Sequence, residues 1–312
     1  MDVIRYDLHY YDPIDGLRLL VAELSVAIGI IFALVSFFGW GVSDLLSKVV
    51  IEKLGYYRTV FFYNFTSAIP LLLFALVFVQ IPPISFKIVL ITALIGFLNT
   101  MVGCLMFYKG LEKGDVSVLS PISSSWGVVT VLLALIFLDE MLTLRQSYSI
   151  VLIFSGIILS SLSWSGLKLA RRKKLVSGAK EVIASTIFWG VALFLLKFVV
   201  DDLGSVWSLV IMRYFGVTFL FLYGKATRQG FNFSERLACI LVITIGLLDV
   251  IGFLGFNLGV TTELVSIVTP IVTSYPAVTF MLAHIFLHER LEKNQYIGIG
   301  MILSGLVLIS VI

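Results

Sequence analysis

Charged side chains are scarce in this chain. Asp, Glu, Lys and Arg make up 13% of its 312 residues, and the apolar types make up 59%. Soluble proteins carry roughly 25% charged residues, because a folded surface needs them to stay dissolved. The composition therefore excludes an ordinary soluble domain. It predicts an all-α, multi-pass integral membrane protein that lies in a lipid bilayer, and we expect that bilayer to be the cell membrane.

Residues that bind metals, cofactors or nucleic acids are also few. The two cysteines, Cys104 and Cys239, both lie in apolar stretches, which predicts buried thiols. His284 and His288 are four residues apart but lack the HExxH pattern of a zinc site. No phosphate-binding loop is present, and a net charge of +3 gives no excess for nucleic acid. We expect no metal, no cofactor and no nucleic-acid partner.

Apolar runs of membrane-spanning length follow one another along almost the whole chain. A span of the hydrocarbon core takes about 20 apolar residues. The first 24 residues are polar and form an expected tail, and 165–180 form a basic linker. The sequence predicts ten transmembrane helices, at 25–51, 57–80, 87–108, 115–138, 146–164, 181–200, 205–223, 237–258, 263–287 and 294–312.

The two halves of the chain repeat each other at one fixed offset. Chance matches between apolar residues would not align Trp, Pro, Glu, Gln and Gly together. We therefore expect two repeats, 25–164 and 181–312. Five crossings is an odd number, so the second repeat enters the membrane from the opposite side and the repeats are inverted. The aligned pairs include Trp40/Trp189, Gly103/Gly252, Pro121/Pro270, Ser125/Ser274, Glu140/Glu289, Gln146/Gln295 and Gly156/Gly305.

The segments 137–156 and 286–305 resemble the signature of EamA-type transporters in the drug/metabolite transporter superfamily. That pattern places Pro in the fourth helix of each repeat, Glu at its end, and Gln and Gly in the fifth. The resemblance implies ten helices and the export or exchange of small metabolites, amino acids or drug-like compounds. One departure is visible: the family's Arg in the second helix appears as Arg213, whereas the matching position in the first repeat is Asn64.

Asp249 stands near the centre of the eighth apolar run, where a carboxylate costs roughly 2.5–3.5 kcal/mol to insert. It is either a proton-titrating or cation-binding group, or an interior Asp bonded to a neighbouring helix. The first alternative would make protons the coupling ion.

Two other charged sites involve Arg213 and Asp44. Arg213 is either the partner of Asp249, a clamp for an anionic substrate, or an Arg that reaches the near interface. Asp44 and Lys48 are four residues apart, which favours a local ion pair on one helix face.

Aromatic and small polar side chains complete the expected pathway. Trp40, between two glycines, and Tyr275 are expected to wall a cavity with the polar Asn99, whereas core packing is favoured for Trp189. Helix breaks are expected at Pro121 and Pro270, where Ser125 and Ser274 would line a polar pathway. Glu140, Glu289, Gln146, Gln295, Gly156 and Gly305 are interpreted as structural.

These features favour a secondary transporter that moves a small organic metabolite by alternating exposure of a central cavity, driven by a proton or substrate gradient. One alternative is a membrane-embedded enzyme or sensor, although no nucleophile elbow or other catalytic motif supports an enzyme. The other is a facilitative exchanger of phosphorylated or nucleotide-linked sugars.

Overall fold

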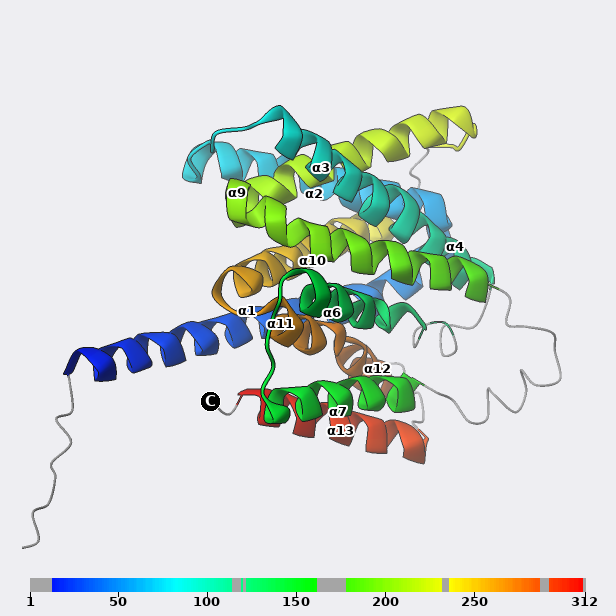
Figure 1. Ribbon diagram of the computed structural model, residues 1–312. Coiled ribbons are helices and arrows are strands. Elements are labelled where there is room, and N and C mark those ends of the chain that lie inside the picture. Colours follow the sequence, from blue (N-terminus) through cyan, green and yellow to red (C-terminus); the bar gives the residue numbers. More distant parts are fainter. Residues whose placement is uncertain are drawn as a thin grey trace, which may run out of the picture.

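The computed structural model describes residues 13–113, 119, 122–161, 178–231, 236–286 and 292–310. Every secondary-structure element in those ranges is a helix, and the helices pack side by side in a bundle (Figure 1). Five of them are long and apolar enough to cross a membrane, and three shorter helices are also apolar. The expected all-α membrane protein is confirmed at this level.

The first half begins with a helix that extends on the N-terminal side beyond its apolar span, which runs over Ser25–Leu54. It starts at Pro13, because proline is favoured in the first helical turn, where its missing N–H needs no partner. The third helical segment is continuous over 86–113 and is called the rod α3–η1–α4. It contains a π-helical stretch, η1. The elements of this half are α1 (Pro13–Leu54), α2 (Tyr56–Phe78), α3 (Phe86–Gly96), η1 (Phe97–Cys104), α4 (Leu105–Lys113), α6 (Trp126–Phe137) and α7 (Leu144–Ser161).

The second half opens with a 48-residue helix, α9, that is broken at Gly204. Gly204 has φ 73° and ψ 166°, a backbone conformation that L side chains avoid. The equivalent Gly55 separates α1 from α2 with φ 74° and ψ 165°. The repeats therefore share one connection between their first two helices. The elements here are α9 (Ala179–Ala226), α10 (Arg236–Thr262), α11 (Val265–Thr273), α12 (Pro276–Phe286) and α13 (Lys293–Ser310).

Each half packs its first helix against the third helical segment of the other half. Helix α1 packs along α10, and α9 packs along the equivalent rod α3–η1–α4. Two hydrogen bonds between the halves show the same reciprocity. The Thr130 hydroxyl donates to the carbonyl of Gly190 at 3.0 Å, and the Thr279 hydroxyl donates to the carbonyl of Gly41 at 2.9 Å. Both partners of one bond are equivalent to the partners of the other. The two halves are thus related by an approximate twofold axis.

Helices α7 and α13, the last of each half, pack on each other in opposite directions (Figure 1). Gly298 lies against Ser160, whereas Gly305, further along α13, lies against Ser149 and Ile153, earlier on α7. The contact order is reversed, so the helices run antiparallel. A Cβ on Gly298 would lie 2.3 Å from the backbone nitrogen of Ser160, so glycine permits this close approach.

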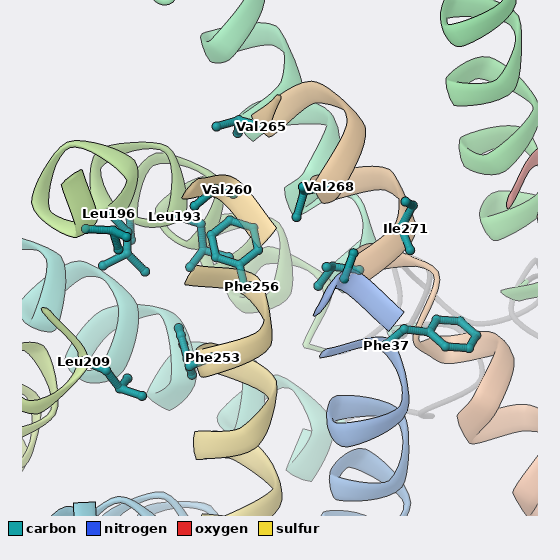
Figure 2. Close-up of a cluster of buried hydrophobic side chains, with 14 of the residues drawn as sticks. Phe37, Leu193, Leu196, Leu209, Phe253, Phe256, Val260, Val265, Val268 and Ile271 are labelled. Carbon is teal, nitrogen blue, oxygen red and sulfur yellow. The ribbon is translucent and has the colours of Figure 1, made fainter. Parts of the chain in front are cut away.

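A hydrophobic cluster fills the space between the halves. Figure 2 shows its side chains converging from α1, α9, α10 and α11. Phe256 of α10 lies near its centre and is fully buried. The labelled members are Phe37, Leu193, Leu196, Leu209, Phe253, Phe256, Val260, Val265, Val268 and Ile271. This packing fixes the helices that surround the cavity described next.

Candidate functional site: a cavity between the two halves

A cavity lies among helices of both halves and encloses about 590 Å³ of space free of protein atoms, including the part that opens to solvent. Several of its lining residues are equivalent positions of the two repeats, so the approximate twofold axis passes through it. These pairs are Trp40/Trp189, Asp44/Leu193, Cys104/Phe253 and Trp126/Tyr275. The remaining lining residues are Ser43, Tyr63, Asn99, Phe107, Tyr108 and Asp249.

Asp249 forms an ion pair with Arg213. Nη2 of Arg213 lies 2.5 Å from Oδ2 of Asp249, and Nη1 donates to Oδ1 of Asn64. The guanidinium carbon also lies 5.6 Å from the centroid of the Phe253 ring. Arg213 is only 2% exposed, so its side chain is buried in the protein and does not extend to the membrane interface. Of the three alternatives for Arg213, the structure shows the partner of Asp249.

The contact between Arg213 and Asn64 also accounts for the asymmetry of this pair. The two residues occupy equivalent positions and meet near the twofold axis. An Arg at both positions would bring two like charges together in a buried place, which is strongly unfavourable. Asn64 instead offers a neutral oxygen acceptor.

Asp44 lines the same cavity from α1. Among the side chains that the structure describes, none forms an ion pair with it. The expected pairing with Lys48 involves a side chain outside the described part of the chain. The spacing of Asp44 from Lys48 gave no sign of this cavity position.

The two equivalent tryptophans both line the cavity but differ in their hydrogen bonding. The indole N–H of Trp189 donates to the carbonyl of Asn99, at 3.0 Å, inside the π-helix η1. A π-turn shifts the backbone ladder and can leave carbonyls for such bonds. The equivalent helix α10 has no π-turn in its described residues, and the buried indole N–H of Trp40, on α1, has no acceptor among the described atoms.

Aromatic rings form much of the remaining wall. The Trp40 ring packs edge to face with Phe253 at 5.1 Å, Trp126 at 6.1 Å and Tyr275 at 6.3 Å between centroids. On the other side, Phe107 lies 5.0 Å from Trp189. Trp40, Tyr275 and Asn99 lie at the cavity, where the sequence placed them. Trp189, expected in the core, lines it as well, and its equivalence to Trp40 was the available signal.

The helix breaks lie next to the cavity. Pro270 lies within α11, and the chain turns only at Ser274 and Tyr275, before Pro276. Ser125 and Ser274 have the same backbone angles, φ −72° and ψ −4°, so the break is repeated. Neither serine is among the lining residues, and Ser274 donates to the Pro270 carbonyl instead. Pro121 lies outside the described residues.

The signature Gln residues have local contacts. Oε1 of Gln146 accepts from the N–H of Thr143, and Oε1 of Gln295 accepts from the equivalent N–H of Glu292. These bonds cap the first turns of α7 and α13.

Glu140 joins the two halves at the start of α11. Its carboxylate accepts from the N–H groups of Val265 and Ser266, both at 2.9 Å, and from the Ser266 hydroxyl at 2.5 Å. Helix N-termini favour an acidic partner because their first N–H groups are unpaired. All residues from 265 to 278 are buried, so Glu140 fixes a buried segment that leads to Tyr275. Glu289, the equivalent residue, lies outside the described part.

Glu140→Ala should therefore destabilise the protein. Hydrogen bonds to a charged group are worth roughly 1.5–3 kcal/mol, so we expect a loss of about 2 kcal/mol in the free energy of unfolding. Chemical unfolding in mild detergent would measure it, and the exposed Glu52→Ala serves as the matched control. Equal stability of the two variants would contradict a capping role.

Comparison with known proteins follows the same division into halves. The profile of the EamA-like transporter family matches residues 27–162 and 177–311. An uncharacterized protein of Methanocaldococcus jannaschii is 36% identical over 141 residues, which is 45% of this chain and 98% of that protein. An uncharacterized transporter of Archaeoglobus fulgidus is 26% identical over 72% of this chain and 77% of its own length. A solved crystal structure aligns with a TM-score of 0.70 at 10% identity, over 90% of this chain and 95% of the other, which shows a shared fold.

Apolar helices, two similar halves and a cavity between them that holds two carboxylates and several aromatic rings are the features of a multi-pass membrane transporter. The matches to both halves place the chain more narrowly. It belongs to the EamA-like transporter family, within the drug/metabolite transporter superfamily.

Proposed function

We propose that this protein is a secondary transporter of the cell membrane that exports or exchanges small organic solutes by alternating access. Ten transmembrane helices, arranged as two inverted repeats, surround the transported solute. The observation that carries the proposal is the cavity on the approximate twofold axis, lined by equivalent residues of both halves. In transporters built from inverted repeats, binding sites lie at this interface.

Three features of the helices support the proposed arrangement: the first concerns the inversion of the repeats, and the other two concern the number of crossings. The equivalent helices α7 and α13 run antiparallel. The positive φ at Gly204 divides α9 into two parts, each long enough for a separate crossing. The short elements α11 and α12 together supply a span comparable to the other rods.

Flux measurements test the proposal. Proteoliposomes that contain the purified protein would be loaded with one unlabelled solute at a time, from a panel of amino acids, amines, sugars and sugar phosphates. The uptake of the same solute in labelled form would then be measured. Saturable uptake of at least one unmodified solute, accelerated by the same solute inside, is the expected result. A chemically modified product would favour the membrane enzyme, and no flux with any solute would contradict the transporter.

Asp249 is the proposed titrating group if protons supply the energy. Asp249→Asn is expected to lower solute flux at least tenfold and to abolish its dependence on an imposed pH gradient, because the amide cannot exchange a proton. The exposed Asp202→Asn is the matched control. If flux and pH profile are both unchanged in Asp249→Asn, protons are not carried there. The charged and titratable groups that face Asp249 are Arg213 of α9, Asp44 of α1, Tyr63 of α2, Cys104 of η1 and Tyr108 of α4.

The charge of the cavity bears on the alternative of a sugar-phosphate exchanger. A polyanion would need several free cations, whereas Arg213 is already engaged by Asp249 and Asn64. An anion clamp at Arg213 would require that ion pair to break. The panel above includes sugar phosphates and decides this point directly.

A further inference from the structure

We propose that the central cavity binds a monovalent organic cation, an ammonium group that carries apolar substituents and no carboxylate. This inference rests on the proposed function, because it names the class of solute that the cavity holds. It follows from the balance of charge at the cavity, from the aromatic wall and from the position of Asp44.

The described charges at the cavity leave one carboxylate uncompensated. Asp44 and Asp249 both line the cavity, and Arg213 neutralises Asp249 from behind. No described side chain forms an ion pair with Asp44. A carboxylate inside a membrane protein is expensive to keep ionised unless water, a ligand or a bound proton compensates its charge. One positive charge in the cavity would complete the balance.

The wall suits an organic cation better than a metal ion. Aromatic rings attract cations through their negatively charged faces, and Trp does so most strongly. Three of the five tryptophans of the chain, Trp40, Trp126 and Trp189, line this cavity. The described residues contain no group of three His, Cys, Asp or Glu side chains that could hold a metal. An ammonium with apolar substituents uses both the single carboxylate and the rings.

The same balance disfavours anions and zwitterions. A carboxylate on the ligand would need a cationic partner, and the guanidinium of Arg213 already contacts Asp249, Asn64 and the Phe253 ring. The ligand's carboxylate would also lie near the carboxylate of Asp44, which would repel it. Phosphorylated solutes meet the same repulsion in a stronger form.

Binding to the purified, full-length protein tests the inference independently of transport. The probes are benzyltrimethylammonium, its uncharged carbon analogue neopentylbenzene, and the anion phenylacetate. Isothermal titration calorimetry gives the affinities, and quenching of tryptophan fluorescence reports whether the ligand reaches the three cavity tryptophans. We expect the ammonium to bind at least tenfold more tightly than the neutral analogue, and phenylacetate not to bind. Equal affinity of the charged and neutral probes would overturn the inference.

Variants of Asp44 show whether this carboxylate is responsible. Asp44→Asn is expected to weaken ammonium binding at least tenfold and to leave the affinity for neopentylbenzene unchanged, whereas Asp44→Glu keeps the charge and most of the affinity. The exposed Asp202→Asn controls for the loss of a negative charge elsewhere. Unchanged affinity in Asp44→Asn contradicts the proposal. A Lys48→Met variant that binds the ammonium more tightly would show that Asp44 is already paired, and would overturn it too.

The outcomes separate this inference from the proposed function. Ammonium binding without flux of any solute would contradict the transporter and leave the cation site standing. Flux of neutral or anionic solutes by a protein that does not bind benzyltrimethylammonium would contradict the cation site and leave the transporter standing.

Discussion

Arg213→Gln is expected to lower the free energy of unfolding by about 3–5 kcal/mol, the range found when one partner of a buried ion pair is removed. The substitution leaves the carboxylate of Asp249 without its cation and Oδ1 of Asn64 without its donor. Arg213 is almost fully buried, so water cannot replace the lost contacts at low cost. Chemical unfolding in mild detergent, followed by circular dichroism, would measure the change.

The double variant Arg213→Gln, Asp249→Asn distinguishes the unpaired charge from a loss of packing. With both charges removed, we expect more than half of the lost stability to return, because two amides can bond to each other. Arg145→Gln, on an exposed position of α7, is the control. A single variant as stable as that control would show that the pair contributes nothing to the folded state.

Gly298→Leu is expected to separate α7 from α13 and to abolish correct folding or lower the unfolding free energy by about 3 kcal/mol or more, the upper end of typical overpacking costs. A Cβ at this position would approach the backbone of Ser160 to 2.3 Å and the Gly156 carbonyl oxygen to 2.7 Å. These are backbone atoms of a neighbouring helix, so no side-chain rotation relieves the clash.

Gly300→Leu is an unusually close control. Gly300 lies two residues further along α13, and a Cβ there would meet nothing within 4 Å. It carries the same change in helix propensity, so the difference between the variants isolates the helix contact. Size-exclusion chromatography in detergent and thermal unfolding would measure it. Equal behaviour of the two variants would show that α7 and α13 do not require their close approach.

The candidate site was predictable only in part. Asp249, Trp40 and Asn99 were found because a charged, aromatic or polar residue within a long apolar run has to face protein or water rather than lipid. The same reasoning failed for Asp44, because the Lys four residues later offered a sufficient local partner in the sequence. The cavity position of Trp189 was also missed, although its equivalence to Trp40 indicated it.

The sequence by itself determined two things: that the chain lies in a membrane, and that its two halves repeat each other. Apolar runs and a fixed offset between Trp40 and Trp189, or Gly156 and Gly305, are properties of residue order, and they hold whatever the helices contact. Only the tertiary structure decided that Arg213 meets Asn64 and Asp249, and that Asp44 faces the cavity. The reason is physical: the direction of a side chain depends on the rotation of its helix about its own axis, and that rotation is set by packing against helices far away in the sequence.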